Sequence, residues 1–341
     1  MAEQSRSRRV EALTIALPRI EHPMLATLVD GPFDDDDWLF EIKWDGVRAI
    51  ATVTPGESPC VHSRTGKDLL LQFPELMELR RAFGRGPFVV DGEIVALDPE
   101  GRSSFQRLQP RLNRRRSDPA LQRSVPATYA VFDLLYAGRK DLRSTPLEER
   151  KAALQRLIHD GAPHVMLSKH VVGNGKKLYA LAKRRALEGI IAKRRDSPYI
   201  ERRSRLWLKI KTHLEQEVVI GGWTDPRGSR EQFGALILGV YDDGGLRYVG
   251  HVGTGFNRDL LDVVMKKMKP LATSRCPFAQ RPPSNAPSHW IRPQLVAEVK
   301  FGEWTDEGIM RQPVFVGLRE DKKPKDVRRE GPVPVVSRRP S

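Results

Sequence analysis

The stretch WLFEIKWDGVR, centred on Lys43, concentrates side chains that could carry out chemistry on a phosphate. Its alternation of polar and apolar residues predicts a strand with Glu41, Lys43 and Asp45 on one face. Asp45 and the glycine after it predict a tight turn into a second strand over 47–53, which would return Arg48 to Lys43. A lysine held between carboxylates and beside an arginine suits an amine nucleophile that attacks a phosphate covalently. A hairpin whose polar face is merely solvated is the alternative.

Four later segments combine a strand pattern with charged residues. They are 63–67 (SRTGK), 89–95 (VVDGEIV), 187–193 (LEGIIAK) and 207–211 (WLKIK). In this order, the five segments resemble the nucleotidyltransferase motifs of the ATP-dependent DNA ligases, whose superfamily also includes RNA ligases and mRNA capping enzymes. The stretches FEIKWDGVRA, DGEIVALDP, VFDLLY, LEGIIAKR, WLKIK and PVFVGLREDK are most similar to the ligase domain of bacterial end-joining ligase D and its stand-alone relatives.

The resemblance implies an α+β fold, in which an ATP-grasp-like ligase core of antiparallel sheets and helices precedes an OB-fold β-barrel. We expect a flexible basic tail over 1–20, an adenylation (nucleotidyltransferase) domain over 21–213, an OB-fold domain over 214–325 and a flexible tail over 326–341. Strands and turns interrupted by one helix near 258–269 agree with a barrel in the second half. A capping box at Thr145, followed by proline, predicts a helix that stops at Gly161.

By this resemblance, Lys43 is the residue that becomes lysyl-AMP. An unperturbed lysine titrates near ~10.4, so this amine must lose its proton more readily than usual to attack ATP at neutral pH. Lys209 and Lys211, together with bound Mg²⁺ or Mn²⁺, are expected to lower the pKa of Lys43 and to offset charge on the α-phosphate. Glu188 and Glu93 match metal-site carboxylates, although a glutamate at a helix end could equally be solvated.

The resemblance also assigns residues to the nucleotide. Phe132 matches the aromatic residue that stacks on adenine, although a phenylalanine in such a strand could be plain core. Glu41 matches a position near the base, where an acceptor for the N6 amine would favour adenine over guanine. Glu93 matches a carboxylate near the ribose hydroxyls, and Arg48 and Arg64 match groups near the sugar and phosphate.

Near the end of the second domain, Arg319 and Lys322 match the last family motif, which reaches the departing pyrophosphate when that domain closes over ATP. A charged and solvated C-terminal end is the alternative interpretation.

The composition agrees with a partner that is a polyanion. The chain has 341 residues, with 58 Lys+Arg against 43 Asp+Glu, a net charge of +15 and a pI near 10.0. Basic residues concentrate in 107–123 and 183–211, where they would hold DNA phosphates without reading bases. Two cysteines exclude a disulfide framework and a four-thiolate zinc site within one chain. No apolar run approaches a membrane span, so we expect a cytoplasmic protein of the bacterial cytosol or nucleoid.

These features predict an ATP-dependent DNA ligase that seals nicks between a 5′-phosphate and a 3′-hydroxyl in duplex DNA, in repair or end joining. The expected partners are nicked or broken duplex DNA and, by analogy, a Ku-type end-binding protein, and we expect a monomer. Two alternatives stay open: an RNA ligase or guanylyltransferase with the same core, and an inactive scaffold that binds DNA ends.

Overall fold

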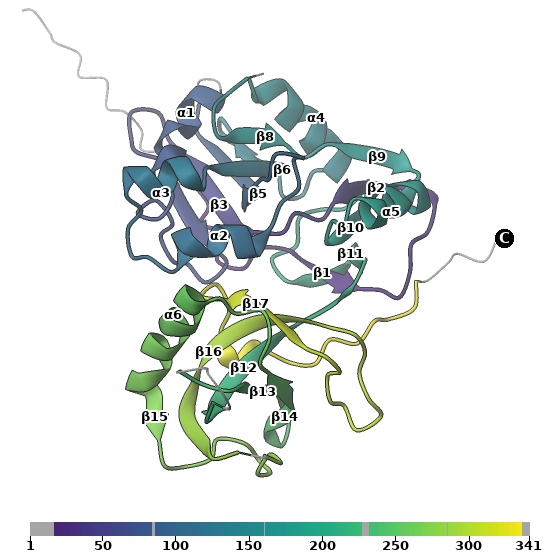
Figure 1. Cartoon of the computed structure of the whole chain (residues 1–341). Helices are drawn as coiled ribbons and strands as arrows, with labels where there is room; N and C mark the ends of the chain where they lie inside the picture. Colours follow the sequence, from purple (N-terminus) through teal and green to yellow (C-terminus); the bar gives the residue numbers. More distant parts are fainter. Residues whose placement is uncertain (1–16, 84–85, 160, 227–231, 285, 336–341) are drawn as a thin grey trace, which may run out of the picture.

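The computed structural model describes residues 17–83, 86–159, 161–226, 232–284 and 286–335, which form two lobes (Figure 1). The upper lobe in Figure 1 contains the chain up to β11, and the lower lobe contains the chain from β12 onward. Most of the predicted N-terminal tail, residues 1–16, lies outside the described residues. Leu17 and Ile20 pack in the core, so residues 17–20 do not form a flexible tail.

One sheet of the upper lobe carries the strand that leads to Lys43. Its strand order is β1-β11-β10-β2-β9, with β1 parallel to β11 and the other pairs antiparallel. Because side chains alternate along β10, Ile190 and Ala192 pack with Ala182 of α5, whereas Lys193 faces the opposite side. The bounds are β1 Leu25–Leu28, β2 Asp35–Ile42, β9 His170–Gly173, β10 Gly189–Arg194, β11 Arg203–Lys211 and α5 Gly175–Arg184.

The other sheet of the upper lobe has the order β4-β3-β5-β6-β7, with β8 added in parallel to β6. Its outer face packs against helices through residues such as Val90, Leu108 and Leu154. The bounds are β3 Val47–Val53, β4 Cys60–Ser63, η1 Pro74–Glu78, α1 Leu79–Ala82, β5 Phe88–Ala96, α2 Phe105–Leu112, α3 Pro119–Ser124, β6 Ala127–Ala137, β7 Lys140–Asp141, α4 Leu147–Leu157 and β8 Val165–Leu167.

A third group of buried residues lies between the two sheets. It includes Met24, Ile50, Phe132, Tyr199 and Trp207, which come from strands and loops of both sheets. This layer fixes how the sheets face each other, and it therefore sets the shape of the space between them.

The hairpin predicted around Lys43 is wrong, because β2 and β3 belong to different sheets. β2 pairs with β10 and β9, whereas β3 pairs with β4 and β5. The four residues between the strands cross from one sheet to the other. Gly46 makes this crossing possible, since a Cβ at this position would overlap the carbonyl oxygen of Ile94. Alternation alone could not reveal which partner each strand takes.

The helix predicted after Thr145 forms as α4, but its start and end differ from the prediction. The Ncap position is Pro146 and no side chain caps it, so the predicted capping box is wrong. The helix ends at Leu157 rather than continuing to Gly161.

Arg111, within the basic stretch expected to contact DNA, is fully buried on α2. Its guanidinium donates to Glu75 at 2.9 and 2.7 Å and to the carbonyl oxygen of Gln72. This residue ties α2 to the η1 segment and cannot face DNA, so this part of the electrostatic prediction is wrong.

The lower lobe is one curled antiparallel sheet with the order β14-β13-β12-β16-β15, and β17 pairs with β16. Thr254, just after β14, forms a β-bridge with Val314, the first residue of β17, as expected for a barrel. Helix α6 is capped by the Asn257 side chain, so the helix expected near 258–269 is present. The bounds are β12 Leu214–Thr224, β13 Leu236–Asp242, β14 Gly245–Val252, α6 Arg258–Met268, η2 Lys269–Leu271, β15 Ala272–Thr273, β16 Ser288–Phe301, β17 Val314–Leu318 and η3 Pro324–Asp326.

Residues 326–335 form a strap that returns from the lower lobe to the upper one, shown in yellow at the right of Figure 1. Val327 is buried in the lower lobe, and Val333 pairs with Val29 and donates its backbone N–H to Leu28 at 3.0 Å. The prediction of a flexible tail from residue 326 is therefore wrong for 326–335, and 336–341 lie outside the described residues. Within the described residues, every helix is too short or too polar to cross a bilayer.

Candidate active site

Every site residue predicted from the sequence lines a single cavity between the two sheets and the lower lobe. These residues are Glu41, Lys43, Arg48, Arg64, Glu93, Phe132, Glu188, Lys209, Lys211, Arg319 and Lys322. Both lobes therefore contribute to one site, and the last two residues reach it from the far end of the chain.

Lys43 stands at the floor of this cavity, directly after β2. Its backbone N–H donates to the carbonyl oxygen of Gly189 at 2.9 Å, and its ammonium group forms an ion pair with Glu188. Burial disfavours the charged amine, but Glu188 outweighs this effect and raises the pKa of Lys43 above its ordinary value. Lys209 and Lys211 repel the charge of Lys43, as predicted, but the nearby Glu188 carboxylate outweighs them, so the net pKa of Lys43 rises.

Glu41 is buried and makes three hydrogen bonds. Its carboxylate accepts from Lys151 at 2.6 Å, from Lys193 at 3.0 Å and from the Ser168 hydroxyl at 2.8 Å. Burial opposes the charge of Glu41, but Lys151 and Lys193 outweigh burial and lower its pKa to about 2. A carboxylate has about four acceptor positions, so one position is left for a ligand.

Phe132 forms one wall of the cavity and has two cations against its ring. The Lys193 nitrogen lies 4.2 Å and the Arg48 guanidinium carbon 4.6 Å from the ring centroid. Trp207 meets the same ring edge-on at 6.1 Å. The aromatic wall is therefore fixed in place and surrounded by positive charge.

Arg48 is held by Asp91 rather than placed beside Lys43. Two of its nitrogens donate to the Asp91 oxygens at 2.5 and 2.6 Å, and one also donates to the Met24 carbonyl at 3.2 Å. The Tyr199 hydroxyl donates to the same carboxylate at 2.7 Å. Asp91 is fully buried, so this network fixes the direction of Arg48 along the cavity wall.

A cluster of carboxylates lies next to Lys43, and it spans both lobes. One oxygen each from Glu188, Glu215 and Glu298 lies within 4.8 Å of the other two. Burial, followed by these three carboxylates, raises the pKa of nearby Asp45 to about 8. The carboxylates that gather around Glu188 thus come from the lower lobe, whereas Glu93, the other predicted metal ligand, does not belong to the cluster. Burial also raises the pKa of Glu93 to about 7.

Arg319 and Lys322 enter the cavity just after β17. Arg319 donates to Asp321 and Glu298 at 2.9 Å, and its guanidinium carbon lies 4.2 Å from the ring centroid of Phe105 on α2. Lys322 forms an ion pair with Glu217. Their orientation thus depends on contacts within the lower lobe and on packing against the upper one.

Sequence reasoning missed several charged residues that hold the predicted ones in place. Among them are Asp91, Lys151, Glu217, Glu298 and Glu330. Asp91 lies within the quoted DGE segment, so its motif could have revealed it. Lys151, Glu298 and Glu330 lie outside all of the quoted motifs, and only the fold brings them to the site.

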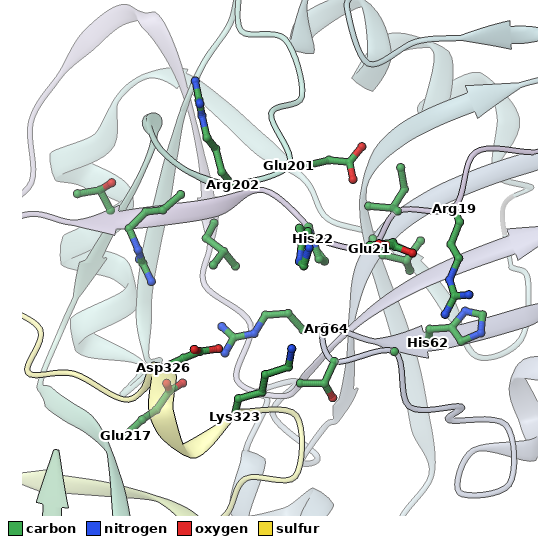
Figure 2. Close-up of a pocket in the computed structure, with 18 of the residues that line it drawn as sticks. Arg19, Glu21, His22, His62, Arg64, Glu201, Arg202, Glu217, Lys323 and Asp326 are labelled. Carbon is green, nitrogen blue, oxygen red and sulfur yellow. The ribbon is translucent and has the colours of Figure 1, made fainter. Parts of the chain in front are cut away.

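A larger hollow of about 990 Å³ continues from this cavity (Figure 2). Figure 2 shows Arg64, Glu217, Lys323 and Asp326 on one side of the hollow. Arg64, Arg203, Glu217 and Glu330 line both spaces, so the two lie next to each other. Arginine and lysine side chains on its walls only slightly outnumber the carboxylates.

Comparison with known families agrees with this geometry. Residues 23–211 match the family model described as ATP dependent DNA ligase domain, and residues 229–322 match the model described as ATP dependent DNA ligase C terminal region. The chain belongs to the ATP-dependent DNA ligase family. This membership confirms the ligase resemblance, the two-domain fold with an OB-fold barrel, and the enzyme class.

Individual relatives of this ligase also include DNA ligases. It is 39% identical over 93% of its length to the multifunctional non-homologous end joining protein LigD of Pseudomonas aeruginosa. It is 37% identical over 90% of its length to the multifunctional non-homologous end joining DNA repair protein LigD of Mycobacterium tuberculosis. The ligase spans only 37% and 40% of the lengths of these two proteins.

A solved structure described as mycobacterial DNA ligase D complexed with ATP and MES is similar throughout. The TM-score is 0.68 at 35% identity, and the match covers 91% of this ligase and 98% of that chain. The fold is therefore similar, over most of the chain, to that of a DNA ligase solved with ATP.

Proposed function

We propose that Lys43 is the nucleophile of an ATP-dependent DNA ligase with three steps. The Lys43 amine attacks the α-phosphorus of ATP, and the bond to pyrophosphate breaks to leave AMP on the lysine nitrogen. The AMP then moves to the 5′-phosphate of a nick, and the 3′-hydroxyl displaces it to seal the strand. The observation that carries this proposal is that Lys43, Lys209, Lys211, Arg319 and Lys322 share one cavity although they come from both lobes.

In this proposal the cavity has a base end and a phosphate end. Glu41 and Phe132 define the base end, where the free acceptor position of Glu41 would take the N6 amine of adenine. Glu93, Arg48 and Arg64 would contact the ribose and the phosphate. Arg319 and Lys322 would face the departing pyrophosphate, because their positive charge offsets the charge that develops there.

The carboxylates around Lys43 fit a divalent cation such as Mg²⁺ or Mn²⁺. Glu188, Glu215 and Glu298 offer hard oxygen atoms close together, which such ions prefer. Glu188 would be the main ligand in this proposal, with Glu93 as a further candidate. A bound cation would supply positive charge next to the α-phosphate. Glu188 would then no longer hold the Lys43 proton as firmly.

Metal binding can be tested without an activity assay. Free Mn²⁺ is measured by electron paramagnetic resonance as protein is added. We expect Glu188→Gln to bind Mn²⁺ at least several-fold more weakly than the wild type. Glu303→Gln makes the same charge change at an exposed position paired with Arg311, and it should bind as the wild type does. Equal binding by all three proteins would count against Glu188 as a ligand.

The test of the ligase proposal uses radiolabelled ATP and GTP with the full chain. We expect a covalent label from ATP, none from GTP, and none from Lys43→Ala. The labelled enzyme should then seal nicked DNA in preference to nicked RNA. Labelling by GTP alone would favour the guanylyltransferase alternative, and absence of any label would favour an inactive DNA-end scaffold.

We further propose that the substrate in the cell is broken DNA during end joining, which places the ligase in the bacterial cytosol. The support is the similarity to two proteins whose names state non-homologous end joining. A Ku-type protein is the proposed partner, and the ligase is proposed to act as a monomer. Ku should stimulate joining of double-strand ends but not of nicks. Equal rates with and without Ku would contradict this partnership, and light scattering would test the monomer.

A further inference from the structure

The strap made by residues 326–335 places a carboxylate on a lysine of the nucleotide cavity. Glu330 accepts from Lys209 through both of its oxygens, at 2.8 and 2.7 Å. Arg203 lies 3.9 Å from the same carboxylate. The Lys209 side chain is 14% exposed and that of Glu330 is 28% exposed, so the pair is partly shielded from water. This is a close, two-point contact rather than a loose surface pair.

The position of Glu330 is fixed by contacts to both lobes. From the lower lobe, the Gln216 side chain accepts from the Glu330 backbone N–H at 3.0 Å and donates to the Arg328 carbonyl at 3.1 Å. From the upper lobe, Leu28 accepts the backbone N–H of Val333 at 3.0 Å, and Arg205 donates to the Pro334 carbonyl at 2.9 Å. Glu330 therefore lies where the strap contacts both lobes, and the present arrangement of the lobes brings it to Lys209.

The contact also acts on the charge of Lys209. Burial lowers the pKa of Lys209 to about 8, with Lys211 and Lys43 lowering it further and Glu330 opposing them. Burial opposes the charge of Glu330, but Lys209 and Lys211 outweigh burial and lower its pKa to about 2, with Glu217 acting against them. Among the largest influences on the pKa of Lys209, only that of Glu330 favours the charged form.

We propose that Glu330 is a positioning residue for lysine adenylylation, which acts by holding Lys209 charged and aimed at the nucleotide phosphates when the two lobes are closed. This rests on the proposed function, in which Lys209 faces the α-phosphate. The strap thereby links domain closure to the first step. We expect the later steps on DNA not to use the contact, because they involve no attack on ATP.

The test compares two steps of the reaction in the full chain of Glu330→Gln. We expect formation of lysyl-AMP from ATP to slow about tenfold in kcat/KM, because a misplaced and partly neutral Lys209 loses part of its effect on the phosphate. The loss in kcat/KM relative to the wild type should be larger at pH 8.5 than at pH 6.5. Sealing of a nick that already carries AMP on its 5′-phosphate should change less than about twofold, since that step needs no lysine nucleophile.

Two further proteins make the result unambiguous. Glu303→Gln, on an exposed pair outside both cavities, should behave as the wild type in both steps. Glu330→Asp in the full chain keeps a carboxylate on a shorter side chain and should recover part of the adenylylation rate, which covers the case in which Glu330→Gln does not fold.

Three results would overturn the inference. Unchanged adenylylation would mean that the contact is incidental, and faster adenylylation would mean that Glu330 competes with the nucleotide for Lys209. Equal losses in both steps would show a structural role only. If the wild type itself takes no label from ATP, the proposed function fails rather than this inference.

Discussion

Lys43 and Glu188 lie 145 residues apart in the chain and form an ion pair in the cavity between the two lobes. Lys43 follows β2 and Glu188 precedes β10, and these two strands pair with Ile42 opposite Ile190. The register of a single sheet thus determines how far the Lys43 amine lies from the Glu188 carboxylate. A slip of one residue in this register would turn one of the two side chains to the other face.

Replacing Lys43 by alanine should abolish lysyl-AMP formation and the sealing of an ordinary nick. The variant should still seal a nick that is already adenylylated, because the final attack by the 3′-hydroxyl uses no amine of the enzyme. Gel assays with both substrates measure this difference. Lys140→Ala, at an exposed position on β7, is the matched control and should retain both activities. Residual labelling of Lys43→Ala by ATP would mean that another residue is the nucleophile.

Lys322→Ala should slow lysine adenylylation by roughly 10- to 100-fold, because a charged donor to the pyrophosphate is lost. The ion pair of Lys322 with Glu217 lies within the lower lobe, so the fold should survive. Sealing of an adenylylated nick should stay near the wild-type rate. Lys325→Ala, an exposed lysine three residues later, serves as the control. If Lys322→Ala charged itself with AMP normally, the role given to the last motif would be wrong.

The sequence predicted the position of a site residue correctly where a motif combines reactive or charged side chains with the alternation of a strand. The alternation in WLKIK placed Lys209 and Lys211 on one face, and both line the cavity. It was uninformative about pairing between strands, because β2 and β3 have the pattern of a hairpin yet lie in different sheets. It also could not show Glu330, since a charged residue near the chain end has no local pattern that distinguishes a strap from a free tail.

Asp91→Asn should strongly destabilise the upper lobe. Asp91 is fully buried and is the only carboxylate, among the described residues, that binds the Arg48 guanidinium. Removing one partner of such a buried pair costs about 3–5 kcal/mol, because the other charge remains without compensation. Thermal unfolding without nucleotide measures this loss. Asp243→Asn, at an exposed pair with Arg328, should leave Tm almost unchanged. Equal shifts in Tm for both variants would contradict the importance of burial.

Lys209→Arg should change how adenylylation depends on pH. Lys209 has a pKa lowered to about 8 by burial, so it is charged below pH 8 and becomes neutral above it. An arginine at this position keeps its charge throughout this range. The ratio of kcat/KM for Lys209→Arg to that of the wild type should therefore rise between pH 7 and pH 9.

Using a ratio removes the other titrating groups from this comparison. Lys43 must lose its proton in both proteins, and Lys193, whose pKa burial also lowers to about 8, is present in both. Lys209→Gln is the companion variant, because its deficit relative to the wild type should shrink as the wild-type lysine becomes neutral. A ratio that stays constant from pH 7 to pH 9 for both variants would show that Lys209 keeps its charge, or that its charge does not act on the phosphate.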